Sequence, residues 1–253
     1  MLANDPVTQA RLDLAAALRS AARHGLNEGV CNHFSMAVPD REDLFIVNPY
    51  GLNWSEIVPS DLVIADFAGN VIEGRYPVEA TAFYIHACIH AAKPRAAVVL
   101  HTHMPYATAL TSICDGRIEM CTQNAFRYWD RIAYDETYGG LALSTAEGER
   151  ICRAMGDKDI LFLRNHGVLV CGPTVAQAYN DLYYLERAAM VQVLAMQTGR
   201  PLHLIDEATA RQTAGLIAED TQQAFLHFES LKRMLDRDEP GWQTSGRRRS
   251  SGE

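Results

Sequence analysis

The chain has 253 residues and a net charge of −8, and 48% of its residues are hydrophobic. This length and composition suit a globular protein, and the acidic charge argues against nucleic acid as a partner, because phosphate binding needs a concentrated basic surface. No apolar run approaches the roughly 20 residues of a membrane span, so we expect no membrane association.

The N-terminal residues and the cysteines both favour a cytoplasmic protein. The first residues, MLANDPVTQARLD, are polar and unlike a secretory signal. The six cysteines have no C-x-x-C spacing, and several lie inside apolar stretches, where a free thiol behaves as a small hydrophobic group. We therefore expect reduced thiols and a cytoplasmic location.

Six segments have the periodicity or the boundaries of helices. The first ends at Gly25, and the second has Glu79 in its first turn and Pro94 beyond its end. The predicted helices are 7–24, 77–93, 103–113, 145–156, 173–198 and 206–235.

Short apolar stretches between clusters of Pro, Gly, Asn and Asp predict strands. They lie at 33–38, 43–48, 61–66 and 96–103, with a hairpin-like pair over 160–172. Most of these strands are too close in sequence for crossover helices between all of them. The chain is therefore predicted to be an α/β protein, a three-layer αβα sandwich with a central, mostly antiparallel or mixed sheet flanked by helices.

We expect one domain over residues 1–242 and a disordered tail at 243–253. No internal repeat or long linker divides the chain before its C-terminus. The tail, QTSGRRRSSGE, has few of the apolar residues that a packed segment needs.

Three histidines interrupt aliphatic, strand-like runs. His101 and His103, in VVLHTHMPYA, alternate along a strand edge, so both side chains point to one face, about 6 to 7 Å apart along the backbone. His166, in LFLRNHGVLV, follows another such strand and precedes a glycine. Three imidazoles with an open position are typical of a catalytic metal site, although H-x-H alone is as typical of a core or surface pair.

A second pair, His86 and His90, has the i and i+4 spacing that also permits chelation on a helix. No glutamate follows His86, so the H-E-x-x-H pattern of metalloproteases is absent. We expect neighbouring groups, not a metal, to satisfy these two histidines.

Several motifs follow one another in a specific order along the chain: LNEGVCNHFS, NPYGLNWSEIVPSDLVIAD, PVEATAFYIH, H-T-H at 101–103 and N-H-G at 165–167. With these motifs the chain resembles the class II aldolase/adducin family over most of residues 10 to 200. Each motif is weak alone, and their order and spacing together are specific. N-H-F-S resembles the adducin-like and decarboxylase branches of that family, not the sugar-phosphate aldolases.

The resemblance implies a metal-dependent lyase. Residue by residue, it implies that His101, His103 and His166 bind one divalent ion per chain, zinc first, with manganese, magnesium or cobalt as alternatives. It implies that Glu79 lies beside the metal and transfers a proton. A metal that holds adjacent substrate oxygens is a Lewis acid, which stabilises the enediolate or enolate left when a C–C bond breaks. A carboxylate in a partly desolvated site can shuttle the proton.

The residues expected at the substrate depart from those of the sugar-phosphate aldolases. Those enzymes have Ser-Ser before the catalytic glutamate, where this chain has Pro77-Val78, and proline has no N–H to offer a phosphate. They have Gly-Asn at the position of Asn32-His33 and Thr-Gly at the position of Tyr50-Gly51. We therefore expect a small-molecule substrate without a phosphate group, and one that carries a carboxylate.

Four residues are candidates for substrate binding: Asn32, His33, Gly51 and Arg127. His33 and Arg127 are the candidates for holding a carboxylate. A solvated surface charge is an equally good interpretation of Arg127.

The resemblance also implies a homotetramer with sites near subunit interfaces, and a tyrosine from the neighbouring subunit that assists protonation. The segment AFRYWDRIAYDETYGG offers Tyr128, Tyr134 and Tyr138, and spacing does not select among them. We take Tyr134 as the candidate for this catalytic role. For each of the three tyrosines, the alternative role is packing at a subunit contact.

Three functions remain open. The first is a retro-aldol lyase for a non-phosphorylated hydroxy-carbonyl or hydroxy-acid substrate. The second is a metal-dependent decarboxylase of an aromatic or keto acid. The third is a non-enzymatic, adducin-like interaction protein, which the retained histidines and Glu79 argue against, because a binding module has no need of this set.

Overall fold

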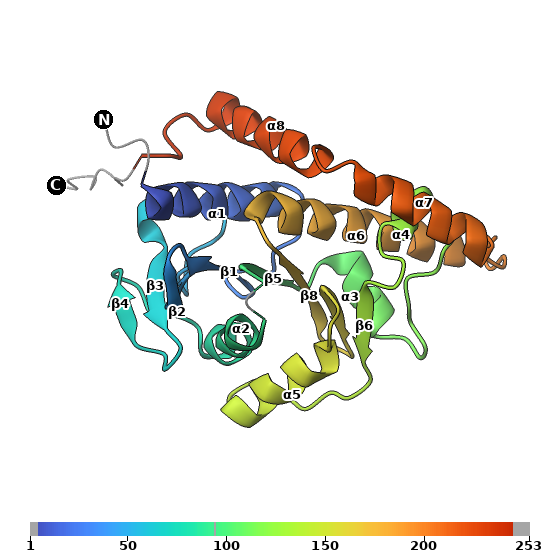
Figure 1. The fold of residues 1–253 in the computed structure, drawn as a ribbon, viewed down its shortest axis with the longest axis horizontal. Coiled ribbons are helices and arrows are strands. Elements are labelled where there is room, and N and C mark those ends of the chain that lie inside the picture. The colour runs from blue at the N-terminus through green and yellow to red at the C-terminus, as the bar shows by residue number, and fades with distance from the viewer. Residues whose placement is uncertain (1–4, 94, 245–253) are drawn as a thin grey trace.

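A computed structural model describes residues 5–93 and 95–244, in which eight strands form one sheet with helices on both faces (Figure 1). The helices are α1 (Pro6–Arg23), α2 (Ala80–Ala92), α3 (Pro105–Thr111), α4 (Gln123–Phe126), α5 (Thr145–Met155), α6 (Val175–Met196), α7 (Glu207–Glu219) and α8 (Gln223–Asp238), with a 3-10 turn η1 at Pro59–Asp61. The strands are β1 (His33–Val38), β2 (Arg41–Val47), β3 (Val63–Asp66), β4 (Val71–Glu73), β5 (Val98–Thr102), β6 (Ile132–Asp135), β7 (Ile160–Leu163) and β8 (Gly167–Gly172).

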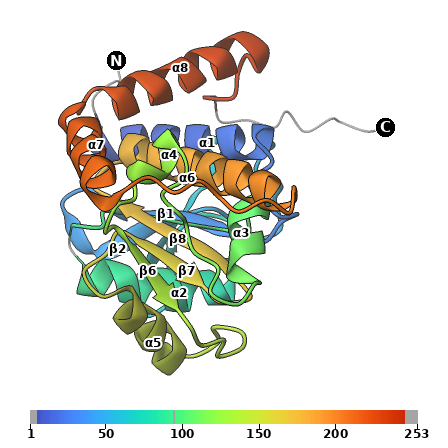
Figure 2. The ribbon, with the colours of Figure 1, turned by 90° about the vertical axis from the view of Figure 1, so that its right-hand side faces the viewer.

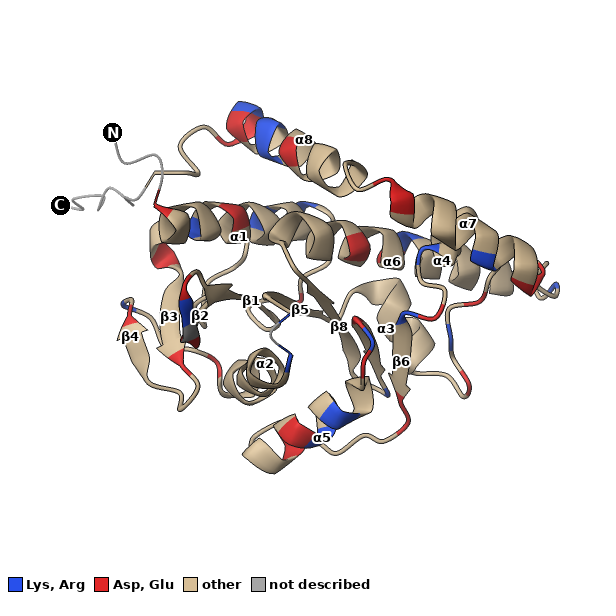
Figure 3. Cartoon of the chain, in the orientation of Figure 1, with Lys and Arg blue, Asp and Glu red and all other residues tan. Residues whose placement is uncertain are grey.

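The strand order is β4-β3-β2-β1-β5-β8-β7-β6, and every neighbouring pair is antiparallel except β6 and β7. This confirms the predicted mixed, mostly antiparallel sheet. The links β1–β2 and β7–β8 are too short to hold a crossover helix, so those strands pair as hairpins. The inner strands β1, β5, β8 and β7 contain no Lys, Arg, Asp or Glu, as a sheet covered on both faces requires (Figure 3).

Helices α1 and α6 cover one face of the sheet, and α2 and α5 cover the other (Figures 1 and 2). The prediction of three layers is confirmed, and α8 adds a partial outer layer by packing on α1 and α6. Alternate residues of β5 serve the two faces: Leu100 packs in the core under α1 and α6, and Val99 in the core over α2 and α5.

Three local predictions were incomplete. The predicted helix 206–235 is two helices, α7 and α8, because the side chain of Asp220 accepts hydrogen bonds from the N–H groups of Gln222 and Gln223 and ends the first helix. The edge strands β4 and β6 were not predicted, and each is only three or four residues long. Glu79 lies outside the first turn of α2, as its N-cap residue.

The predicted tail at 243–253 lies almost wholly in residues 245–253, outside the described residues, and stays a prediction, as does the single domain over 1–242. Within the described ranges, no helix is both long enough and apolar enough to cross a membrane.

Candidate metal centre

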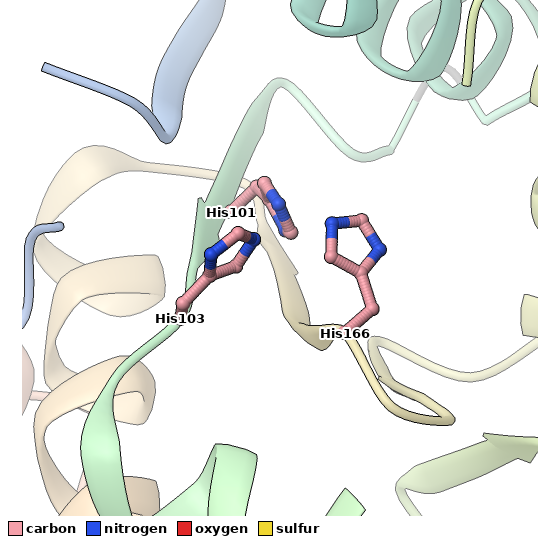
Figure 4. A group of neighbouring side chains, drawn as sticks. All are labelled: His101, His103 and His166. Carbon is pink, nitrogen blue, oxygen red and sulfur yellow. The ribbon is translucent and has the colours of Figure 1, made fainter. Parts of the chain in front are cut away.

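Three histidines meet at one edge of the sheet (Figure 4). His101 belongs to β5, His103 follows that strand, and His166 lies in the turn between β7 and β8. One ring nitrogen from each lies within 4.8 Å of the others. The ring centroids are 5.1 Å apart for His101 and His103, and 4.8 and 4.9 Å from each of these to His166. The structure thus brings together the three ligands predicted from the sequence.

The turn between β7 and β8 places His166 opposite β5. His166 N–H donates to the carbonyl of Leu163 at 3.1 Å, and Asn165 has a positive φ of 55°, which tightens the turn. Gly167 lies so close to β5 that a Cβ atom at this position would be 2.5 Å from the carbonyl oxygen of Thr102 and 2.7 Å from the His103 ring. The N-H-G motif is therefore a packing requirement as well as a source of an imidazole.

Hydrogen bonds indicate which nitrogen of the His101 and His103 rings faces the cluster. Nδ1 of His101 lies 3.0 Å from the carbonyl oxygen of Val168, which only accepts, so this nitrogen carries the hydrogen and Nε2 keeps its lone pair. Nδ1 of His103 lies 2.5 Å from Oε2 of Glu28. A carboxylate or carbonyl behind the imidazole is the usual outer shell of a metal-binding histidine.

Two observations show that these residues fit a divalent cation. Nε2 of His103 is buried and has no hydrogen-bond partner among the described residues. Burial, helped by His166, lowers the pKa of His101 well below its usual range, and burial together with His103 lowers the pKa of His166 to about 4. The imidazoles of His101 and His166 are thus neutral at pH 7, which is the form that binds metal.

His33 lies between Glu79 and the three-histidine cluster. Oε2 of Glu79 accepts a hydrogen bond from Ala82 N–H at 3.0 Å, shares a second hydrogen bond with the Thr81 hydroxyl, and lies 3.8 Å from Nε2 of His33. The His33 ring stacks on His101, with centroids 4.8 Å apart. The register of β1 on β5, which pairs His33 with His101, produces this stack.

Asn32 and Gly51 lie in turns around the same site. The Oδ1 atom of Asn32 accepts hydrogen bonds from His103 N–H at 3.3 Å and from Glu28 N–H at 3.1 Å, and its Nδ2 is buried without a partner in the described structure. Gly51 has a φ of +90°, which favours glycine. Next to it, Tyr50 N–H donates to the carbonyl of Pro77 at 2.9 Å, so the 50–51 turn lies against the segment that precedes Glu79.

His33 is almost completely buried, with 3% of its surface exposed. Both of its ring nitrogens have partners: Nδ1 is 2.8 Å from Nε2 of His86, and Nε2 is 3.3 Å from the Thr81 hydroxyl. Within this chain, its polar atoms are already occupied by protein groups.

Arg127 and Tyr134 are not brought to the histidines within one chain. The guanidinium of Arg127 lies 4.1 Å from the centroid of the Tyr184 ring, and it lines a cleft of about 1250 Å³ that also contains Ala97 and Gly172. These two residues lie at the ends of β5 and β8 opposite to the histidines. The Tyr134 hydroxyl accepts from Ile118 N–H at 3.0 Å.

Sequence reasoning missed Glu28 and Thr81. Glu28 precedes His103 by 75 residues, so no local spacing connects the two side chains. Thr81 could have been found from its position two residues after the helix-opening Glu79, because a hydroxyl there can hydrogen-bond to the side chain of the N-cap residue.

Comparison with known proteins places this geometry in a family. A family model described as the class II aldolase and adducin N-terminal domain matches residues 12–193. Decarboxylase NovR of Streptomyces niveus is 30% identical over 227 residues, which cover 88% of this chain and 84% of that protein.

Two solved structures have the same fold. An aldolase II superfamily protein from Pseudomonas syringae superposes with a TM-score of 0.87 at 31% identity, covering 93% of this chain and 95% of the other. L-fuculose 1-phosphate aldolase from Glaciozyma antarctica PI12 superposes with a TM-score of 0.82 at 26% identity, covering 94% and 92%. The chain therefore belongs to the class II aldolase and adducin family.

Proposed function

We propose that this chain is a divalent-metal-dependent C–C lyase of the retro-aldol type, acting on a non-phosphorylated hydroxy-carbonyl or hydroxy-acid substrate. The observation that carries the proposal is the convergence of three imidazoles, with the buried Nε2 of His103 lacking a partner within the described residues. A binding module does not need a set of desolvated lone pairs aimed at one point, whereas a metal centre does.

His101, His103 and His166 would hold the ion, which supplies a Lewis acid for the negative charge that develops on substrate oxygens. Asn32 lies beside His103 and offers Nδ2–H to a substrate oxygen, since that donor has no protein partner among the described residues. Glu79, with 28% of its side chain exposed, holds the proton that is moved to or from the substrate carbon. Gly51 lets the neighbouring turn approach the substrate closely.

The lack of free backbone donors at residues 50 and 77 supports a substrate without a phosphate group. Pro77 has no N–H, and its carbonyl occupies the N–H of Tyr50 at 2.9 Å. At these two positions the backbone therefore offers a phosphate no donor. A carboxylate needs fewer hydrogen-bond donors than a phosphate. The lack of donors at residues 50 and 77 is therefore consistent with a substrate that carries a carboxylate.

A metal-dependent decarboxylase of an aromatic or keto acid is the second candidate. It is favoured by the 30% identity to decarboxylase NovR. Loss of carbon dioxide leaves negative charge beside the same oxygens as aldol cleavage does, so the same residues serve both reactions. Assays that detect aldehyde release and carbon dioxide release from a panel of hydroxy and keto acids separate the two candidates.

The finer parts of the proposal are zinc as the ion, a homotetramer with sites near the subunit interfaces, and a cytoplasmic location. Three imidazoles with an open position are typical of catalytic zinc. Tyr134 of a neighbouring subunit remains the predicted protonation partner, and Arg127 the predicted carboxylate partner, because neither reaches the histidines of its own chain.

Metal analysis of the purified protein tests the proposal. We expect about one divalent ion per chain. His103→Ala should lose the ion and the turnover together, whereas His203→Ala, which changes an exposed histidine, should keep both. Metal-free protein with full turnover would contradict the proposed lyase, and protein with neither metal nor turnover would favour the adducin-like interaction protein.

A further inference from the structure

Beneath α2, a continuous line of hydrogen bonds runs from Glu79 into the core. Nε2 of His33 meets the Thr81 hydroxyl, which bonds Glu79, and Nδ1 of His33 lies 2.8 Å from Nε2 of His86. Nδ1 of His86 lies 2.6 Å from Ser35 Oγ. The line continues at 2.7 Å from Ser35 Oγ to Nε2 of His90, whose Nδ1 lies 3.1 Å from the carbonyl oxygen of Ala96.

The core members of this line are buried. The exposed fractions are 3% for His33, 7% for His90, and 0% for His86 and Ser35. Burial and His90 lower the pKa of His86 well below its usual value, and burial lowers the pKa of His90 to about 4. These two imidazoles are therefore neutral at pH 7, and each has one N–H and one lone pair.

The direction of every bond follows from the carbonyl at the far end. The Ala96 oxygen only accepts, so His90 carries its hydrogen on Nδ1 and accepts from Ser35 through Nε2. The single hydroxyl hydrogen of Ser35 is then used, so His86 donates to Ser35 from Nδ1. His86 accepts through Nε2, and the donor at that contact is Nδ1 of His33.

We propose that the line Ala96–His90–Ser35–His86 fixes His33 as its Nδ1–H tautomer, so that Nε2 of His33 accepts from Thr81 and thereby positions Glu79 for proton transfer. This inference rests on the proposed function of Glu79. It makes His33 a positioning residue that does not touch the substrate, in place of the carboxylate-binding role expected from the sequence. It also gives a role to His86 and His90, whose ring nitrogens are satisfied by Ser35, His33 and the Ala96 carbonyl.

Thr81 is the link between the line and the carboxyl group. Its one hydroxyl hydrogen can go to His33 Nε2 or to Glu79 Oε2, and not to both. When Glu79 carries a proton it donates to Thr81, and Thr81 donates to His33. When Glu79 has given the proton to the substrate, the hydroxyl turns to the carboxylate. The Thr81 hydroxyl thus changes its acceptor when Glu79 loses or regains its proton, while the histidines keep their tautomers.

The tautomers can be measured without any substrate, by long-range ¹H–¹⁵N NMR of the histidine rings in the full chain. We expect the hydrogen on Nδ1 in His33, His86 and His90. In Ser35→Ala the constraint is lost, and His33 should populate the Nε2–H form. The matched control is Ser20→Ala, since Ser20 is 1% exposed on α1 and its hydroxyl has no hydrogen-bond partner within the described chain. Wild-type His33 with its hydrogen on Nε2, or an unchanged tautomer in Ser35→Ala, would overturn the proposal.

Kinetics of a Thr81 pair test the link to Glu79 and avoid the buried core. Thr81→Ser keeps the hydroxyl and should keep kcat within a few fold. Thr81→Val removes it with little change of shape and should lower kcat about tenfold or more, with KM and metal content unchanged, which is about 1.4 kcal/mol in the barrier. Equal kcat in the two variants would overturn the positioning role. A wild-type protein without turnover would refute the proposed function instead, and the NMR result would still decide the tautomers.

Discussion

The carboxylate of Glu28 lies 2.5 Å from Nδ1 of His103, and Oδ1 of Asn32 accepts from the N–H of the same histidine at 3.3 Å. One loop between α1 and β1 therefore holds both the ring and the backbone of a candidate metal ligand. The ligand is positioned by residues about 70 positions earlier in the chain, so the centre depends on the fold of the whole sheet.

Glu28→Gln should weaken metal binding 10- to 100-fold, roughly the loss that follows when a partner behind a metal-binding histidine is changed. The amide still makes a hydrogen bond and no longer supplies the negative charge that makes the imidazole a better ligand. Competition with a chelator of known affinity measures the change. Glu149→Gln, on the exposed side of α5, is the control. Equal affinities in the two variants would contradict the role of Glu28.

Gly167→Ala should destabilise the protein by about 1–3 kcal/mol, because the new methyl group would lie 2.5 Å from the carbonyl oxygen of Thr102. Gly215→Ala is the matched control, since its Cβ meets nothing within 4 Å and the residue lies inside α7, where alanine should stabilise by about 0.5–1 kcal/mol. Chemical denaturation of both variants measures the two free energies of unfolding. Destabilisation of similar size in both would show that the close approach of β8 to β5 is not the cause.

Glu186 should make stability depend on pH near neutrality. Its carboxyl oxygens accept from Tyr106 and Ala107 N–H at 2.8 and 2.9 Å, at the start of α3, and burial raises its pKa to about 7 from 4.5. Because the folded value is the higher one, the stabilising contribution is complete below about pH 4.5. It is lost as the pH rises through about 7, by up to roughly 3 kcal/mol.

Denaturation of the wild type and Glu186→Gln across this pH range checks the prediction. The variant cannot titrate at this position, so the difference between the two free energies of unfolding should change between pH 4.5 and 8. The variant should also be less stable at low pH by about 1–3 kcal/mol, since its amide NH2 faces one of the two backbone donors. Parallel profiles would show that Glu186 keeps the same charge throughout.

Phosphorylated substrates should be poor substrates for this protein. Pro77 lacks an N–H and its carbonyl occupies Tyr50 N–H, so kcat/KM for fuculose or ribulose phosphates should fall at least about tenfold below that for the best hydroxy acid found. Steady-state assays on both classes measure the ratio. Efficient turnover of the sugar phosphates would mean that other groups bind phosphate and that the interpretation of Pro77-Val78 is wrong.

Some of the fold and part of the candidate site could be predicted from local patterns. Apolar stretches with short links indicate paired strands, and the alternation in His101-Thr102-His103 places two imidazoles on one face. N-H-G places His166 in a tight turn. These features follow from backbone periodicity and turn chemistry, which extend over a few residues and are visible in the order of amino acids.

The sequence by itself thus determined the layered sheet and the three imidazoles, together with the family to which they point. Only the tertiary structure decided what lies behind them: Glu28 on His103, and the chain from His33 through His86 and Ser35 to His90. It also placed Arg127 and Tyr134 away from the histidines of their own chain. The physical reason is that these contacts join residues about 50 to 75 positions apart, and the register of β1 on β5 and the packing of α2 decide which of them meet.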